Sequence, residues 1–158
     1  MKAVTLHQPW ASLMAMGLKT NETRSWFTRY RGTIAIHAGK KNWCKSPFQT
    51  ISVFGGELNK EETDKLQPIL LGGHNLPVGA ILAYADLVYC RKMVDAFATD
   101  LVREQSGTTV IAIADQTPLE RKLGDWTEGR FAWGFENFRK LDEPIPYKGA
   151  QGLWEYRE

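Results

Sequence analysis

The chain has 158 residues, of which 43% are hydrophobic and 24% charged, a balance typical of a folded globular protein. This length suits one domain, residues 1–158, and is enough for a sizeable hydrophobic core. No apolar stretch approaches the roughly 18 to 20 residues that cross a bilayer, and the N-terminus has no apolar run followed by a cleavage site, so we expect neither membrane contact nor secretion. A cytoplasmic location is the simplest expectation.

The net charge of +2 hides an uneven distribution of charge. Residues 1–41 contain seven basic side chains and one acidic side chain, whereas the rest of the chain contains thirteen basic and seventeen acidic ones. This asymmetry predicts a positive patch of the kind that a polyanion binder uses. The two cysteines and three histidines stand singly, without the spacing of a metal site, so we expect no metal and no cofactor.

The hydrophobic pattern predicts short strands with sparse helices between them. The expected strands cover residues 2–7, 22–26, 33–38, 79–90, 108–114 and 130–140, and the expected helices cover residues 9–17, 60–71, 92–104 and 117–123. Gly17 is a natural helix terminator. Asp86 interrupts an apolar strand and should therefore have a polar partner. Gly134 marks either a bulge or a close approach to the backbone. Together these elements predict an α+β fold, a small mixed β-barrel with helical insertions.

The segment from Gly17 to Trp26 does not have the pattern of a purely structural strand. Because side chains alternate along a strand, Glu22, Arg24 and Trp26 should share one face, with Thr23 and Ser25 on the other. A strand that only supported a core would carry apolar residues at these alternate positions. The alternative is that Lys19, Glu22 and Arg24 form an ion-pair network that merely fastens the turn.

The residue types in and around this segment favour a nucleic-acid or nucleotide site. Its predicted ligand-binding residues are Trp10, Lys19, Glu22, Arg24, Trp26, Arg31, His37, Lys40 and Lys41. The basic side chains would neutralise phosphates, and an indole or the Tyr30 ring would stack on a base. Glu22 would accept hydrogen bonds from an exocyclic amine or a ribose. The expected partner is RNA or another single-stranded nucleic acid, or else a nucleotide or nucleoside; for Trp10, a role as core anchor is the alternative.

The motifs at both ends of the chain resemble the ASCH domain family, in its longer bacterial and phage form. The resemblance rests on Gln8-Pro9-Trp10-Ala11, Gly17-x-Lys19-x-x-Glu22-x-Arg24, Tyr30-Arg31-Gly32, Gly129-Arg130-Phe131-Ala132-Trp133 and Gln151-Gly152-Leu153-Trp154. It implies a PUA-like barrel with a cleft between the barrel and its first helix. It also implies binding of RNA or DNA, and some members of the family are ribonucleases.

Three functions stay open at this point. Metal-independent RNA cleavage would use Lys19, Glu22 and Tyr30 as catalytic residues, with His37 and Arg31 beside the phosphate. A short bacterial branch of the family hydrolyses N4-acetylcytidine; Lys19 matches its lysine, but Glu22 stands where that branch has its nucleophilic threonine. Thr20, Thr23 or Ser25 would have to supply the hydroxyl here, although alternation directs Thr23 and Ser25 away from Glu22. The third function is a protein-interaction module whose basic turn docks an acidic partner.

Overall fold

The structure is a computed structural model that describes residues 1–43, 54, 57–95 and 109–157. Its elements are, in order, β1 (Lys2–Gln8), α1 (Trp10–Ala15), β2 (Asn21–Arg24), β3 (Gly32–Asn42), α3 (Lys60–Gly72), the 3-10 turn η1 (Gly73–Asn75), β4 (Ala80–Val94), β5 (Val110–Ala112), α5 (Pro118–Lys122), β6 (Phe131–Pro146) and β7 (Leu153–Glu155). The α+β class predicted from the sequence is confirmed. In the described ranges, no helix has the length and apolar character that spanning a membrane requires.

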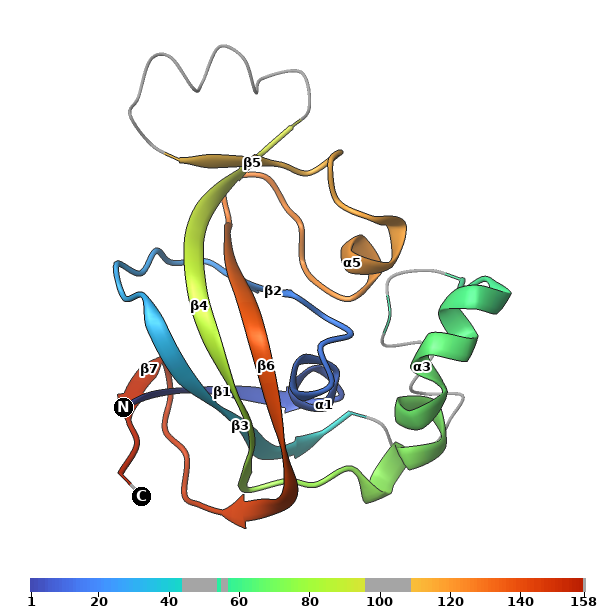
Figure 1. Cartoon of the computed structure of the whole chain (residues 1–158). Helices are drawn as coiled ribbons and strands as arrows, with labels where there is room; N and C mark the ends of the chain where they lie inside the picture. The colour runs from blue at the N-terminus through green and yellow to red at the C-terminus, as the bar shows by residue number, and fades with distance from the viewer. Residues whose placement is uncertain (44–53, 55–56, 96–108, 158) are drawn as a thin grey trace.

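The described strands form one mixed sheet of seven strands, one or two more than the sequence predicted. Six of them follow the order β2-β6-β4-β3-β1-β7, and β5 pairs with β4. The long antiparallel ribbon of β4 and β6 runs through the middle of the molecule, with α1 on one side of it (Figure 1). Strand β2 stands at the end of this order, and among the described strands it pairs only with β6.

The main core lies between α1 and the inner face of the curved sheet. Val4 and Leu6 of β1 and Ile34 and Ile36 of β3 are buried there. Ala35, between the two isoleucines, belongs to a separate cluster on the opposite face. The strand predicted over residues 33–38 is present, and its side chains alternate between the two faces of the sheet. Each fully buried aliphatic side chain contributes about 1.5–3 kcal/mol to the hydrophobic driving force.

Asp86 in β4 has the partners that its apolar strand predicted. Its carboxylate accepts hydrogen bonds from Thr33 Oγ1 at 2.8 Å, Asn137 Nδ2 at 3.0 Å and Arg139 Nη2 at 3.1 Å. The bonds from Arg139, Asn137 and Thr33 lower the pKa of Asp86 to about 2. The carboxylate thus ties β3, β4 and β6 together across the sheet.

Gly134 shows both of the features considered for it. The register between β4 and β6 shifts between Leu87 and Tyr89, beside the partner of Gly134. The Tyr89 ring also lies directly over the glycine, because a Cβ added to Gly134 would be 2.1 Å from Tyr89 Cζ. The Tyr89 hydroxyl donates a 2.6 Å hydrogen bond to Asn21 Oδ1. The Tyr89 ring that packs on Gly134 is therefore also bonded to β2, through Asn21.

The helix predicted over residues 92–104 is wrong at its start. Lys92, Met93 and Val94 continue β4 and pair in parallel with β5. Met93 is fully buried against Trp126, so its apolar character serves the sheet and not a helix face. The part of this prediction from residue 96 onward lies outside the described residues.

Candidate functional site

The turn that follows α1 delivers Lys19 to the site. Gly17 adopts a left-handed conformation with φ of 68°. The Leu18 N–H bonds to the Leu13 carbonyl at 2.9 Å, and the Gly17 N–H bonds to the Met14 carbonyl at 3.0 Å. This pair of bonds is the Schellman ending of a helix, which favours glycine at the left-handed position. The predicted role of Gly17 as terminator is therefore confirmed, and the chain turns sharply into β2.

Lys19, Glu22 and Arg24 form a chain of charges on β2 and the residues before it. The side chain of Lys19 is only 1% exposed; its Nζ donates to the Asn21 carbonyl and lies 4.0 Å from Glu22 Oε2. Glu22 Oε1 pairs with Arg24 Nε at 3.1 Å, and Glu22 is 12% exposed. Arg24 Nη2 donates a 2.9 Å hydrogen bond to the Thr5 carbonyl of β1. The network thus fastens β2 to β1, and its Lys19–Glu22 end lines a hollow.

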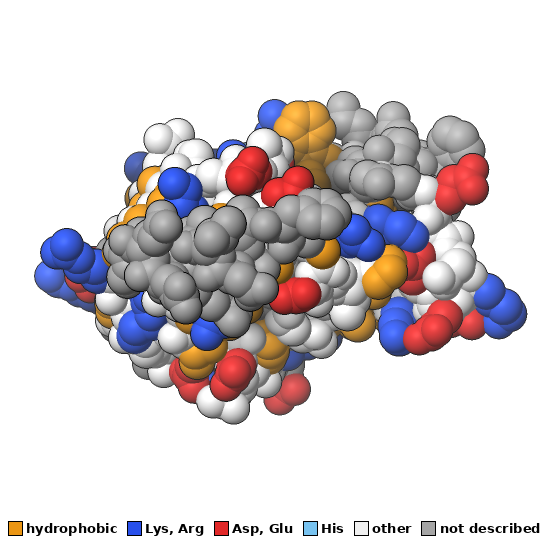
Figure 2. All heavy atoms as spheres, turned by 90° about the horizontal axis from the view of Figure 1, so that it is seen from above, with side chains coloured by type: hydrophobic (Ala, Val, Ile, Leu, Met, Phe, Trp, Pro, Cys, Tyr) orange, Lys and Arg blue, Asp and Glu red, His pale blue; other side chains and the backbone are white. Residues whose placement is uncertain are grey.

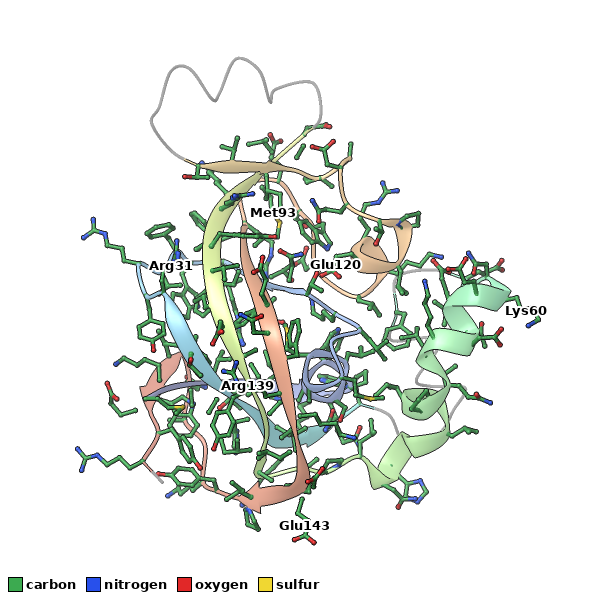
Figure 3. The ribbon with its side chains drawn as sticks, in the orientation of Figure 1. Arg31, Lys60, Met93, Glu120, Arg139 and Glu143 are labelled. Atoms are coloured by element: carbon green, nitrogen blue, oxygen red, sulfur yellow. The ribbon has the colours of Figure 1, made fainter. Side chains whose placement is uncertain are left out.

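Helix α5 and the loop after it cover the outer edge of β2. The Glu120 carboxylate accepts hydrogen bonds from the backbone N–H groups of Asn21 at 2.9 Å and Thr20 at 3.3 Å. Thr23 Oγ1 accepts one from the Asp125 N–H at 3.0 Å. Side-chain groups therefore satisfy an edge that would otherwise be a template for strand pairing. Figure 3 shows Glu120 in this position, between β2 and α5.

A cleft of about 350 Å³ opens at this edge. We call it the β2 cleft; it is lined by Trp10, Lys19, Glu22, Thr23, Lys122, Leu123, Gly124, Asp125 and Arg130. A Cβ added to Gly124 would lie 3.2 Å from Lys19 Nζ and 3.3 Å from Thr23 Oγ1, so the absence of a side chain at Gly124 leaves the space beside both groups unfilled. Because the cleft lies at a strand edge, residues from both faces of β2 reach it. Thr23 therefore lines the cleft together with Glu22, although the burial of β2 alternates from one residue to the next.

The charges around the β2 cleft are mixed in sign. Lys122 Nζ pairs with Glu62 at 2.6 Å, and this bond keeps the pKa of Glu62 low. Arg130 Nε pairs with Asp125 Oδ2 at 3.2 Å; the pKa of Asp125 is lowered by the Thr127 hydroxyl and, to a smaller extent, by Arg130. Figure 2 likewise shows basic and acidic side chains interspersed over the β5 and α5 end of the molecule. The cleft can therefore meet hydrogen-bond donors as well as anions.

Three predicted residues lie away from the β2 cleft. Trp26 falls beyond the end of β2, is 37% exposed, and packs edge-on against Trp133 at 4.5 Å between ring centroids. The Tyr30 hydroxyl donates to the Thr33 carbonyl at 2.9 Å. Arg31 donates to backbone carbonyls of its own turn, and in Figure 3 the β4–β6 ribbon lies between it and Glu120. The structure thus does not bring these residues together with Lys19.

His37, Lys40 and Lys41 lie on or beside a second hollow, which we call the His37 groove. It has a volume of about 590 Å³ and is lined by Thr5, His7, His37, Gly39, Lys40, Gly79 and residues 147–151. His37 is buried, and burial lowers its pKa. Lys41 does not line the groove; its Nζ lies 3.7 Å from the centroid of the Trp43 ring. Of the predicted ligand-binding residues, the β2 cleft contains Trp10, Lys19 and Glu22 and the His37 groove contains His37 and Lys40, whereas Arg24, Trp26, Arg31 and Lys41 line neither hollow.

Comparison with known proteins identifies the family. The model of the ASCH domain matches residues 4–145, which is most of the chain. The chain belongs to the ASCH domain family. It is 33% identical over 160 residues to mouse activating signal cointegrator 1, and 35% identical over 95 residues to the human protein of that name. The first match covers 95% of the chain but 24% of the mouse protein, and the second covers 55% of the chain and 14% of the human protein.

Solved structures show the same fold. The crystal structure of ASCH from Zymomonas mobilis superposes with a TM-score of 0.50 at 15% sequence identity, covering 99% of this chain and 87% of that one. A point variant of the same protein gives 0.50 at 14% identity, with 99% and 90% coverage. The PUA-like fold that the resemblance implied is therefore confirmed.

Several residues of the β2 cleft were not predicted from the sequence. They are Lys122, Leu123, Gly124, Asp125 and Arg130, together with Glu120 behind the cleft wall. About a hundred residues separate them from Lys19 along the chain, so no local pattern connects the two groups. Two weak signals were present in the sequence. The first is Thr117-Pro118, a pair typical of a helix start, and the Thr117 side chain does cap α5. Gly124 then marks the loop that turns toward β2.

Proposed function

We propose that this ASCH domain binds nucleic acid, with RNA as the first expectation, by holding one nucleobase in the β2 cleft. The observation that carries the proposal is that the Trp10 side chain and the Lys19–Glu22 pair open into the same hollow. Stacking on an aromatic side chain and polar contact with a base edge are the two components of single-strand recognition. A nucleotide or nucleoside would meet the same groups.

The size and polarity of the β2 cleft fit this proposal. Ligand sites in proteins are usually about 300–1,000 Å³ in volume, and 350 Å³ lies at the lower end, where one base with its sugar fits better than a larger molecule. Glu22 and Asp125 can accept from an exocyclic amine, and Thr23 can both donate and accept. Lys122 and Arg130, at the rim, are suited to a neighbouring phosphate.

Replacing Trp10 tests the stacking contact. Trp10→Ala should weaken binding of a fluorescein-labelled ten-nucleotide RNA by about 5- to 150-fold, because base–aromatic stacking contributes about 1–3 kcal/mol. Trp10→Phe keeps a ring and should recover most of the affinity. Fluorescence anisotropy at several salt concentrations measures both variants.

The melting temperature is the control, since Trp10 also packs against the cluster around Leu13 and Leu66. Equal RNA affinity for wild type and Trp10→Ala, both folded, would contradict base binding at this position. A wild-type affinity that does not fall with salt would contradict phosphate contacts, because displaced counterions make such binding salt-dependent.

Hydrolysis of an N4-acylated cytidine is the second candidate function, and one observation favours it. Thr23 Oγ1 and Lys19 Nζ both lie close to the surface of Gly124, inside the β2 cleft. In this hypothesis Thr23 attacks the acyl carbonyl, Lys19 receives the hydroxyl proton and returns it to the leaving amine, and water then hydrolyses the acyl-threonine ester. The Asp125 N–H, which donates to Thr23 Oγ1, would orient the nucleophile.

The variant Thr23→Val separates this candidate from simple binding. Valine keeps the shape of threonine and removes the hydroxyl, so turnover of N4-acetylcytidine should fall to background, whereas RNA affinity should fall by no more than the contribution of one hydrogen bond, about 0.5–1.5 kcal/mol. Chromatographic detection of released cytidine measures turnover. Wild-type protein that releases no cytidine, or a Thr23→Val variant that remains active, would exclude Thr23 as nucleophile.

The arrangement gives less support to the other two functions. Ribonuclease chemistry with Lys19, Tyr30 and His37 would need these groups around one phosphate, whereas Tyr30 and His37 do not line the β2 cleft. A protein-interaction module would use the exposed basic turn at Arg31, whose guanidinium is held by carbonyls of Thr28 and Tyr30. Neither of these two functions would use the β2 cleft beside Lys19.

A further inference from the structure

Residues 147–150 pack tightly against β1 and β3 and form one side of the His37 groove. His37 Nε2 bonds to the Tyr147 carbonyl at 3.0 Å, and Thr5 Oγ1 donates to the Ala150 carbonyl at 2.7 Å. Gly149 lies so close to the His37 ring that an added Cβ would be 2.2 Å from Cε1. His37 Nδ1 also contacts Thr5 Oγ1, at 3.2 Å. Both nitrogens of His37 are therefore engaged, and the imidazole forms a fixed wall of the groove.

The free charges of the groove are all basic. These charges belong to Lys40 and Lys148, which line the groove and are exposed. No Asp or Glu is among the described residues that line it. Neither lysine forms an ion pair within the part of the chain that the structure describes. This contrasts with the β2 cleft, where Lys122 and Arg130 each have a carboxylate partner.

A short chain of contacts connects the groove with the β2 cleft. Glu22 lines the cleft and pairs with Arg24, whose guanidinium donates to the carbonyl of Thr5, and Thr5 lines the groove. His7 lies close to this chain of contacts. Burial and the charges of Lys41 and Arg24 lower the pKa of His7, and the charge of Glu22 raises it. The Glu22–Arg24 pair thus connects a residue that lines the β2 cleft with a residue that lines the His37 groove.

We propose that the His37 groove is a second subsite, in which Lys40 and Lys148 bind a phosphate of the same single strand whose base occupies the β2 cleft. This inference rests on the proposed function and makes it more specific: the ligand is a polynucleotide and not a free nucleoside. Lysine is a point charge with three donors and suits a phosphate that has no fixed orientation. Gly39 and Gly149 line the groove without adding side chains to it.

The double variant Lys40→Ala/Lys148→Ala tests the subsite. Its affinity for a ten-nucleotide single-stranded RNA should fall about tenfold at low salt, and the slope of log affinity against log salt should decrease by about 0.7, because one phosphate contact is lost. Its affinity for a mononucleotide, measured by calorimetry, should match that of the wild type. The matched control is Lys60→Ala/Lys65→Ala, which removes the same charge from the exposed face of α3, where both lysines already pair with acids.

The outcomes separate the two proposals. A double variant that binds the RNA as tightly as the wild type, with the same salt slope, overturns the subsite and leaves the β2 cleft intact. An equal loss in the Lys60→Ala/Lys65→Ala control also overturns it, because general charge would then explain the effect. Loss of RNA binding in the groove variant, with no effect of Trp10→Ala, would instead overturn the base site. A wild-type protein without RNA affinity would overturn both.

Discussion

Lys19→Met is expected to reduce RNA affinity by about 10- to 100-fold while leaving the protein folded. The reason is that Lys19 places a buried ammonium at the wall of the β2 cleft, and a hydrogen bond to a charged group contributes about 1.5–3 kcal/mol. Methionine retains the length and the apolar stem of lysine, so the packing around it changes little. Fluorescence anisotropy with single-stranded RNA gives the affinity, and thermal unfolding gives the stability.

The same experiment distinguishes a binding site from an ion-pair network that only fastens the turn. If the network is only a fastening, Lys19→Met lowers the melting temperature and leaves RNA affinity unchanged. Lys65→Met is the matched control: it removes the same charge from an exposed i,i+4 pair with Glu61 on α3 and should change neither quantity.

Gly134→Ala is expected to be the most destabilising single-methyl change in the described sheet. The added Cβ would overlap the Tyr89 ring, which is held between β4 and β6 and cannot swing away without losing its bond to Asn21. Overpacking of this kind costs about 1–3 kcal/mol, and a chain of this size loses about 2–4 °C of melting temperature per kcal/mol. RNA affinity should also fall, since Asn21 supports Lys19 through its carbonyl.

Two further variants show whether the Tyr89 ring is the cause. Gly72→Ala places a methyl against only the flexible end of Leu76 at the end of α3, and should be nearly neutral. Tyr89→Ala/Gly134→Ala should be no less stable than Tyr89→Ala alone, because the ring that collides is gone. A double variant that is less stable than Tyr89→Ala by the full cost of Gly134→Ala would show that the methyl group acts elsewhere.

The fold was predictable where local physics decides the structure. Gly17 ends α1 because the chain needs a left-handed residue there, and Asp86 has partners because a carboxylate in a buried strand requires them. The pattern failed at Met93, where the spacing of apolar residues is compatible with either a helix or a strand. Pairing with β5 decides the matter, and no local pattern encodes that pairing.

The candidate site was predictable only on its N-terminal side. The two N-terminal motifs are recognisable in the sequence and contain Trp10, Lys19 and Glu22. All three of these residues line the β2 cleft. Its other wall comes from residues 122–130, which meet β2 through side chains across a long separation in sequence. Strand alternation places Thr23 and Glu22 on opposite faces of the sheet, so Thr23 was not expected in a site on the Glu22 face. The β2 cleft lies at the edge of the strand, and Thr23 lines it there, beside Asp125.

The attachment of α5 to β2 has a consequence for how members of this family diverge. Glu120 and Thr23 connect the two elements, and no strand ladder joins them. Insertions or substitutions in the segment 117–130 can therefore remodel the outer wall without disturbing the register of the sheet. A change in this segment alone can therefore alter which ligand the cleft accepts, with Lys19 and Glu22 left in place.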